Sequence, residues 1–393
     1  MKTMKWKFYS LAFVAGMSIL TACSSDDNND NDGNGGNGNG NEIENGTILK
    51  GTITSDVTLA AGNTYKLSGE YIVEEGATLH IEEGVKIIAV YDDIADYILV
   101  KQGGKINAVG TPDKPIVMTS EKEEPGAWGG IHICGRAHTN AEGGKGSSEI
   151  GGAVYGGNDD ADNSGTLQYI RLEYTGFAFD EEHEANGISF YSVGNGTIVD
   201  HCQAYKGSDD GFEFFGGSVN VSNLVAVSCS DDSFDWTEGW NGKGTNLVAY
   251  QEAESTLGYD CDCLMECDNN GSNNAATPVA HPVLKNLILV GNGGSKQGIR
   301  LRAGTEVEID NAKVCGKGQP LTVETALTEN ALKNGTSKLT NITLTSELSC
   351  KEGIYTHADF IAVTSNKVDA NLSYSSFEDI RKECSWMNGS WVK

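Results

Sequence analysis

The sequence is poor in basic residues, in proline and in histidine arranged for metal binding. It has 28 Lys and Arg against 55 Asp and Glu, a formal net charge of −27 at pH 7, which argues against nucleic acid or an anionic membrane surface as a partner. None of its 7 histidines has a ligand spacing such as HExxH, so they are assigned no site. Only 6 prolines accompany 50 glycines, and stretches rich in helix-forming residues are few, so we expect short strands separated by turns.

The N-terminus has the features of an export signal. Three lysines precede an apolar segment at 8–20 that is too short to span a bilayer. This segment ends in LTAC, the bacterial lipobox pattern, whose cysteine is Cys23. We therefore expect residues 1–22 to be removed and Cys23 to carry the acyl chains that anchor the protein to a membrane.

The next segment, 23–44, is predicted to be a flexible tether. Its stretch SSDDNNDNDGNGGNGNGNE contains no apolar side chain, so burial cannot offset the entropy lost on ordering. The acidic run directly after the cysteine resembles the surface-export signal of Bacteroidota lipoproteins, which implies an outer-membrane protein exposed on the cell surface. The folded body is then expected at 45–393.

An internal repeat predicts the architecture of that body. SDDGFEF at 208–214 recurs as SDDSFDW at 230–236, an offset of 230 − 208 = 22 residues, and Cys202–Tyr205 aligns with Leu224–Val227 at the same offset. GIRLRAG, which starts at Gly298, repeats the pattern of GFEFFGG. A unit of this length suits one coil of a solenoid, in which each coil pairs only with its neighbours. We predict an all-β chain folded as a right-handed parallel β-helix; a β-propeller, which needs a longer and stricter period with antiparallel hairpins, is the alternative.

Much of the body also resembles a known family. The segments GATLHIEEGVKI, GGKINAVGTPDKPIVMTS, GAWGGIHICGRA, YGGNDDADNSGTLQYIRLEYTG, GSDDGFEFFGG and DDSFDWTEGWNG are similar to the β-helical surface lipoproteins common in Bacteroidota. The similarity extends over nearly all of the chain after the tether and implies a fold and a location rather than an activity. By the same resemblance, Phe377, Trp386 and Trp391 belong to an aromatic C-terminal cap that covers the last open coil.

Strand alternation predicts an outward acidic patch. Glu213 lies between inward-facing Phe212 and Phe214, and Asp235 is its counterpart one coil later, roughly 4.8 Å away. Four more carboxylates share the 22-residue offset in the adjoining turns: Asp209, Asp210, Asp231 and Asp232. Six oxygen-rich side chains on one patch fit Ca²⁺, which takes six to eight oxygen ligands. The alternative is a structural ladder in which turn aspartates accept hydrogen bonds from backbone amides.

The cysteines leave several arrangements open. Without Cys23, nine of the 10 cysteines remain, an odd number in an exported chain where disulfides are permitted. Cys261, Cys263 and Cys267 are close enough in sequence for a local disulfide or a metal site. However, CDCLMEC is not a known zinc spacing, so a disulfide beside a packed thiol is the alternative.

An enzyme that cleaves polysaccharides is one functional hypothesis. Many β-helices are such enzymes, including pectate lyases and polygalacturonases, and carboxylates about 5 Å apart, as expected for Glu213 and Asp235, suit a retaining glycosidase. Arg300 is the nearest candidate for the base of a lyase by repeat alignment. The Gly-His-Gly element of polygalacturonases is missing, so the sequence does not complete a catalytic set.

Binding is the preferred hypothesis. Trp240, Tyr250 and Tyr259 offer aromatic faces on which sugar rings could stack, on the rigid surface of a solenoid. We expect a monomeric surface adhesin or glycan-binding protein, dependent on Ca²⁺, that contacts a polysaccharide or a surface protein of a host or bacterium. A lyase or glycoside hydrolase acting on acidic glycans and a structural surface protein are the alternatives.

Overall fold

The computed structural model describes residues 41–393 except 93 and 180–182. The predicted signal peptide, the lipidation site Cys23 and the tether as far as residue 40 lie outside the described residues. Residues 41–43, predicted as part of the tether, instead pair with residues 57–59 as a strand, so the boundary predicted at residue 45 was too late. Within the described part of the chain, no helix has both the length and the apolar character needed to cross a bilayer.

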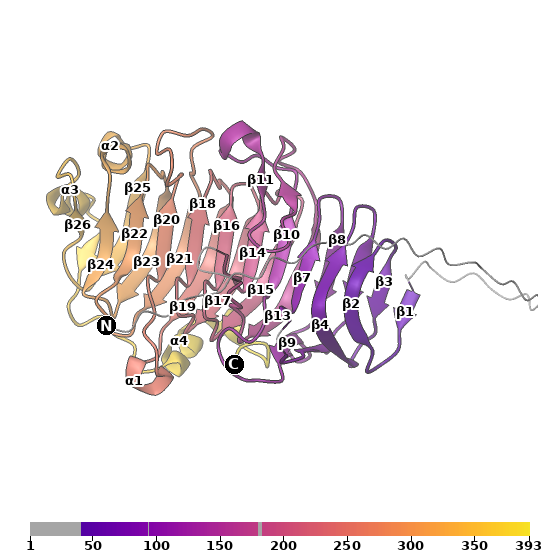
Figure 1. Ribbon diagram of the computed structural model, residues 1–393. Coiled ribbons are helices and arrows are strands. Elements are labelled where there is room, and N and C mark those ends of the chain that lie inside the picture. The colour runs from indigo at the N-terminus through magenta and orange to yellow at the C-terminus, as the bar shows by residue number, and fades with distance from the viewer. Residues whose placement is uncertain (1–40, 93, 180–182) are drawn as a thin grey trace, which may run out of the picture. The chain divides into compact units, whose positions relative to one another are not determined.

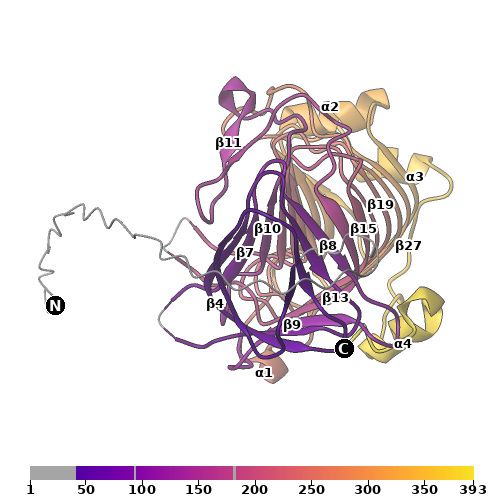
Figure 2. The ribbon, with the colours of Figure 1, turned by 90° about the vertical axis from the view of Figure 1, so that its right-hand side faces the viewer.

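The body is a right-handed parallel β-helix, as predicted. Among the described residues, twenty-five strands form one sheet in which every pairing is parallel, and Figures 1 and 2 show this sheet wound into stacked coils with three sides. The pairing of Cys202 with Leu224 and of Phe212 with Phe234 confirms the 22-residue offset of two successive coils. The alternative of a β-propeller is wrong, because a propeller blade requires antiparallel pairing within this sheet.

Each side is a stack of strands from successive coils. The first side consists of β7 (Tyr97–Val100), β10 (Ile131–Cys134), β14 (Ile188–Tyr191), β16 (Phe212–Phe215), β18 (Phe234–Thr237), β20 (Met265–Asp268), β22 (Gln297–Arg302), β24 (Gln319–Val323) and β26 (Ser349–Cys350). The second side begins with β1 (Asn41–Ile43), β3 (Val57–Leu59), β5 (Thr78–Ile81) and β8 (Lys105–Val109). The third side begins with β6 (Lys86–Ala89) and β9 (Ile116–Ser120).

Longer strands bend around the corners between these sides. β2 (Ile48–Ile53) and β4 (Thr64–Val73) run from the third side to the first. The second and third sides are continued by the two arms of β13 (Gly165–Glu173), β15 (Ile198–Tyr205), β17 (Asn220–Val227), β19 (Lys243–Tyr250), β21 (Val283–Val290), β23 (Glu308–Cys315) and β25 (Lys338–Leu344), and β27 (Lys367–Val368) follows on the third side. At the bend each of the seven strands has a residue with positive φ, which is asparagine in the last five of them. Asparagine tolerates this left-handed conformation better than most residues, so it suits the corner.

Short elements decorate the coils. They are the antiparallel pair β11 (Gly146–Ser147) and β12 (Val154–Tyr155), and the helices η1 (Glu142–Gly144), α1 (Glu254–Leu257), α2 (Ala326–Asn334), α3 (His357–Ala362), α4 (Phe377–Glu383) and η2 (Ser385–Met387). The β11–β12 pair stands above the first side in Figure 1.

The core is a continuous column of apolar side chains. On the first side, aliphatic residues face inward in the early and late coils, whereas aromatic residues face inward in the middle. Phe190 stacks on Phe214 with ring centroids 5.1 Å apart, and Phe212 stacks on Phe234 at 5.6 Å. These stacked rings fix the register of successive coils and hold their strands in place.

The last coil is covered differently from the prediction. Phe360 of α3 and Tyr355 complete the core at this end. Phe377, Trp386 and Trp391 instead lie on the outside of the third side, against apolar side chains such as Val225 and Val248. The prediction of an aromatic cap over the last coil was therefore wrong, because these outward valines and their neighbours form a second apolar surface that the C-terminal segment covers.

The cysteines form no disulfide among the described residues, where all nine are free thiols and only Cys350 is not fully buried. Cys267 faces the core between Trp236 and Leu301 of the neighbouring coils. The predicted local disulfide or metal site shared by the three cysteines is therefore wrong, since strand alternation points Cys267 away from the turn that holds Cys261 and Cys263. Of the alternative, the packed thiol is confirmed at Cys267, but the disulfide is wrong because Cys261 and Cys263 are free thiols.

Candidate functional site

A column of polar side chains runs along the outside of the first side. Glu213 of β16 pairs with Asp235 of β18, Asp235 pairs with Glu266 of β20, and Glu266 pairs with Arg300 of β22. Their sequence neighbours Phe212 and Phe214 are buried in the core. The outward orientation predicted for Glu213 and Asp235 and the alignment of Arg300 with them are both confirmed.

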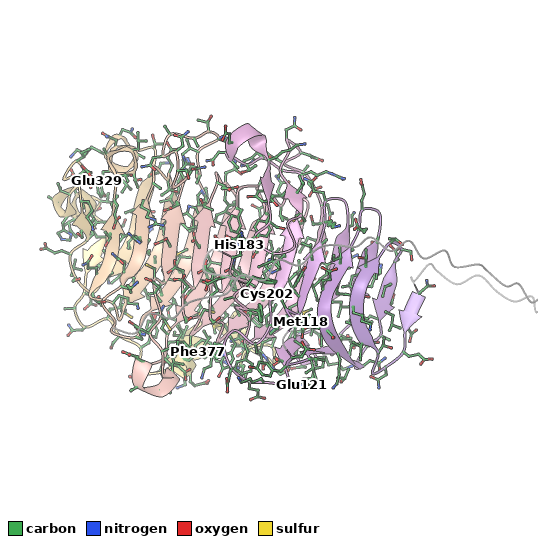
Figure 3. The ribbon with its side chains drawn as sticks, viewed as in Figure 1. Met118, Glu121, His183, Cys202, Glu329 and Phe377 are labelled. Carbon is green, nitrogen blue, oxygen red and sulfur yellow. The ribbon has the colours of Figure 1, made fainter. Side chains whose placement is uncertain are left out.

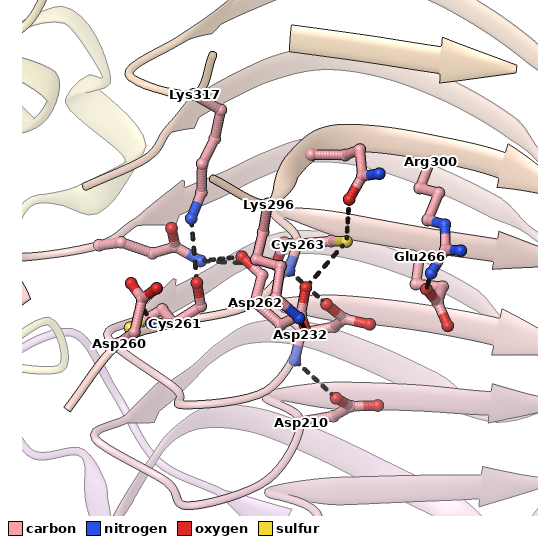
Figure 4. Close-up of polar contacts among 12 residues, drawn as sticks. Asp210, Asp232, Asp260, Cys261, Asp262, Cys263, Glu266, Lys296, Arg300 and Lys317 are labelled. Atoms are coloured by element: carbon pink, nitrogen blue, oxygen red, sulfur yellow. Dashed lines mark hydrogen bonds and ion pairs between the residues drawn. The ribbon is translucent and has the colours of Figure 1, made fainter. Parts of the chain in front are cut away.

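The turns before these strands add a second row of carboxylates. The backbone N–H of Asp232 donates to Oδ1 of Asp210 at 2.8 Å, and the N–H of Cys263 donates to Oδ1 of Asp232 at 2.6 Å (Figure 4). Each buried turn aspartate thus connects its coil to the next, as expected of a structural ladder. This role occupies only one oxygen of each carboxylate.

Together the two rows line an open groove of about 390 Å³. Among the described residues, its lining consists of ten carboxylates and one basic side chain: Glu149, Glu184, Asp209, Asp210, Glu213, Asp231, Asp232, Asp235, Asp262, Glu266 and Arg300. The six carboxylates predicted from the sequence are all present.

The other four carboxylates of the groove were not predicted from the sequence; they are Glu149, Glu184, Asp262 and Glu266. Glu266 follows Asp235 by 31 residues rather than 22, because the turn before β20 is longer, so the strict repeat did not reveal it. Glu149 comes from the β11–β12 loop and Glu184 from the loop after β13, and neither has a periodic signal in the sequence. Figure 3 shows His183, the neighbour of Glu184, over the first side.

Burial and mutual repulsion favour the protonated forms of these carboxyls. Burial, together with the charge of Asp231, raises the pKa of Asp209 to about 8, and burial together with Asp262 raises the pKa of Asp231 to about 6. Burial also raises the pKa of Glu213 and Asp235 well above the ordinary value, and neighbouring carboxylates add to the effect. So many like charges in one groove need either protons or a bound cation to balance them.

Several sets of these side chains could hold a cation. In the described part of the chain, four sets of three ligand atoms lie within 4.8 Å of one another: Asp209, Asp210 and Asp231; Asp210, Glu213 and Asp235; Asp232, Asp235 and Glu266; Asp232, Asp262 and Cys263. The first three sets offer only oxygen, which is the donor that Ca²⁺ prefers. Oδ1 of Asp235 is also buried without a hydrogen-bond partner among the described residues, so a cation would satisfy it.

Arg300 is engaged by carboxylates. Its Nη1 lies 2.7 Å from Oε1 of Glu266, and its Nε lies 3.3 Å from Oε1 of Glu324. Although burial opposes its charge, these two carboxylates raise the pKa of Arg300 above the ordinary value. The structure therefore does not support Arg300 as the proton-abstracting base of a lyase, because it holds its proton more tightly than a free arginine.

The predicted aromatic ligands do not meet at the groove. Trp240 is 1% exposed, stacks on Phe214 with ring centroids 4.2 Å apart, and donates from Nε1 to the carbonyl of Val219. Its prediction as a sugar-stacking residue is therefore wrong, since its ring completes the core.

The two predicted tyrosines also serve contacts within the protein. Tyr250 lies at the end of β19, and its ring contacts Phe377 of the C-terminal segment at 5.4 Å. The hydroxyl of Tyr259 donates to the carbonyl of Ser228 at 2.8 Å. Neither residue lines the groove.

A different aromatic residue is exposed on a loop of the groove. Ala178 pairs with Glu184 in an antiparallel bridge, and next to it Phe179 is 43% exposed. The ring of Phe179 contacts Phe177 and Tyr97, with centroids 5.2 Å and 6.0 Å away. The ring is thus packed against two aromatic residues and still partly exposed, and no repeat in the sequence indicated this position.

Comparison with known proteins identifies a family and a similar solved structure. A family model described as a pectate-lyase-like β-helix domain matches residues 51–392. The crystal structure of the Dettilon tailspike protein (gp208) is similar at 9% identity and a TM-score of 0.30, over 75% of this chain and 55% of that chain. The chain thus spans little more than half the length of the tailspike. No curated protein matches the sequence.

Proposed function

Because the chain belongs to the pectate-lyase-like β-helix domain family, we propose that it is a surface glycan-binding protein or adhesin whose acidic groove binds a polysaccharide with the help of Ca²⁺. The observation that carries this proposal is the groove itself, where, among the described residues, ten carboxylates face a single arginine on one side of the solenoid. Such a surface attracts cations, and a bound cation can in turn coordinate hydroxyl or carboxylate oxygens of a sugar.

The scaffold supports binding because it holds the groove in place. Strands β16, β18 and β20 are each paired on both edges, so their outward side chains have fixed spacing. A ligand that fits this spacing loses little free energy to reorganisation of the protein. An extended groove along stacked coils also suits a polymer better than a small ligand.

The proposed location is the outer membrane, facing the outside of the cell. The lipobox at Cys23 and the acidic tether support a lipid-anchored body held away from the bilayer. The net charge of −27 is compatible with a protein that must avoid adsorption to an anionic lipid surface.

A retention experiment tests the binding proposal. Purified protein is passed over immobilised acidic and neutral polysaccharides with Ca²⁺ or with a chelator. We expect the protein to be retained only when Ca²⁺ is present. Glu213→Gln and Asp235→Asn should each lower the affinity for the polysaccharide at least about tenfold, equivalent to about 1.4 kcal/mol. Glu254→Gln, a change at an exposed glutamate of α1, is the matched control and retains wild-type binding. Absence of retention on every polysaccharide would reject the proposal and favour a protein partner or a structural role.

A glycoside hydrolase is the second candidate, favoured by one observation. Glu213 and Asp235 are paired on adjacent coils, about 4.8 Å apart along the sheet, near the separation of the two carboxyls in a retaining enzyme. The raised pKa of both groups would allow one to act as a general acid. Release of reducing ends by the wild type and its loss in Glu213→Gln would establish this candidate in place of a simple binding protein.

A further inference from the structure

The floor of the groove contains two overlapping sets of ligands. Asp210, Glu213 and Asp235 form one set, and Asp232, Asp235 and Glu266 form the other, each with ligand atoms within 4.8 Å of one another. Asp235 belongs to both because its strand, β18, lies between the strands of Glu213 and Glu266. The two sets are therefore related by one step along the solenoid.

The shared residue has an unused ligand atom. Oδ1 of Asp235 is buried and lacks a hydrogen-bond partner among the described residues, a costly arrangement unless an ion or another group binds there. Asp210 and Asp232 are 6% and 5% exposed, and the hydrogen bonds of the described residues use only Oδ1 of each. Oδ2 of Asp210 and Oδ2 of Asp232, two residues that line the groove, thus have no hydrogen-bond partner among the described residues.

The two sets differ in the positive charge that already balances them. Glu266 contacts Nη1 of Arg300 at 2.7 Å and Nη2 of Arg302 at 2.5 Å (Figure 4 shows the first of these pairs). In the described part of the chain, Glu213 instead accepts a hydrogen bond from the neutral Nδ2 of Asn186 at 2.6 Å. A cation at the Glu213 set therefore meets more uncompensated negative charge than one at the Glu266 set.

We propose that the floor of the groove binds two Ca²⁺ ions that share Asp235 as a bridging ligand. One ion takes Asp210 and Glu213 as its further ligands, and the other takes Asp232 and Glu266. The inference rests on the proposed calcium-dependent function and adds the number of ions, their ligands and their order of affinity. Oxygen ligands in flexible positions favour Ca²⁺. A negatively charged carboxylate between the two ions offsets the repulsion between cations that lie one coil apart, about 4.8 Å.

Counting bound calcium tests this inference without any polysaccharide. Metal-free protein is dialysed to equilibrium against Ca²⁺, and bound ions per chain are measured over a range of free concentrations. We expect two ions with unequal affinity. Glu213→Gln weakens the tighter site and Glu266→Gln the weaker one, each by at least about tenfold, whereas Asp235→Asn weakens both.

The matched control is Asp113→Asn, which removes an exposed carboxylate outside the groove and leaves two ions bound. Circular dichroism of each metal-free variant shows whether it is folded, and Glu213→Gln remains informative if Glu266→Gln unfolds because Arg300 and Arg302 each lose one of their carboxylate partners. A single ion in the wild type, or an Asp235→Asn variant that keeps one site at full affinity, would overturn the inference.

The result is separable from that of the proposed function. Calcium-dependent retention on a polysaccharide with one ion per chain would support the function and reject the shared site. Two ions per chain without retention on any polysaccharide would support the shared site and reject the function.

Discussion

Asp96 is a buried carboxyl outside the groove lining, and it gives the stability a dependence on pH. It is 1% exposed, Oδ1 accepts a hydrogen bond from the N–H of Gly69 at 2.5 Å, and Oδ2 is buried without a partner among the described residues. Burial raises its pKa to about 6, and the nearby charge of Asp92 adds to this despite the opposing hydrogen bond from Gly69. The folded state therefore holds this proton more tightly than the unfolded state does.

The expected consequence is a loss of stability as the pH rises. Between pH about 4 and 6 the unfolded chain releases the proton of Asp96 first, so the free energy of unfolding falls through this window, by at most about 3 kcal/mol. Asp96→Asn carries no such proton and should lose less stability over the same range. Urea unfolding of both proteins at pH 4 and pH 7 in chelator measures the difference, and equal losses in the two would contradict the assignment.

Trp240 and Phe179 illustrate opposite roles for aromatic residues. Trp240→Ala removes a core ring and should lower the free energy of unfolding by about 3–5 kcal/mol. Phe179→Ala removes a half-exposed ring and should change stability by less than about 1 kcal/mol while weakening polysaccharide retention severalfold. Denaturant unfolding and retention, measured on both variants, separate these outcomes; unchanged retention of Phe179→Ala would exclude the ring from the binding surface.

At the scale of elements, the corners of the solenoid depend on a ladder of asparagines. Nδ2 of Asn286 donates to Oδ1 of Asn246 at 3.0 Å, and Nδ2 of Asn311 donates to Oδ1 of Asn286 at 2.8 Å. The backbone of Asn286 has φ 60°, which a β-branched residue adopts only with strain.

Two substitutions of Asn286 separate backbone strain from the loss of the ladder. Asn286→Gly loses the side-chain hydrogen bonds but keeps the left-handed conformation, whereas Asn286→Val loses both. We expect the valine variant to be less stable than the glycine variant by about 1–2 kcal/mol. Equal stability of the two in denaturant unfolding would show that the corner is not held in this conformation.

The C-terminal segment acts as a strap along the third side. Trp391 is fully buried against the arms of β15 and neighbouring strands, the N–H of Ser390 donates to the carbonyl of Pro112, and Nζ of Lys393 contacts Glu173 at 3.1 Å. These contacts connect the end of the chain to coils that lie far earlier in the sequence.

Loss of the strap should loosen the third side but not the groove. Trp391→Ala is expected to cost about 3–5 kcal/mol and to speed hydrogen exchange in the second arms of β15, β17 and β19. Exchange in β16 and β18 should change little, and Trp386→Ala, at a half-buried tryptophan, is the milder comparison. Faster exchange in the groove strands alone would contradict this division.

At the scale of the whole molecule, the excess of negative charge opposes the compact state, and cations should relieve it. A ligand that binds only the folded protein adds about 2.7 kcal/mol of stability at 100 times its dissociation constant. We therefore expect Ca²⁺ to raise the thermal midpoint of metal-free protein more than NaCl of the same ionic strength. Asp235→Asn should remove most of this difference, and an equal effect of both salts would indicate screening rather than a specific site.

The sequence by itself determined the coil and the orientation of its side chains. The 22-residue repeat and the alternation around Phe212, Phe214 and Phe234 are local, since each residue's direction follows from its position in a strand and each coil contacts only the next. The repeat is enough to align Glu213 with Asp235, and the similarity of GIRLRAG to GFEFFGG aligns Arg300 with them; the strand pairing confirms both.

Only the tertiary structure decided what lies over that column and what is buried behind it. Glu149 and Glu184 reach the groove on irregular loops, and Trp240 turns into the core rather than toward solvent. The C-terminal aromatic residues lie along the third side because an outward apolar surface there is available to them. These outcomes depend on packing between segments far apart in the chain, for which neither a repeat nor an alternation leaves a signal in the sequence.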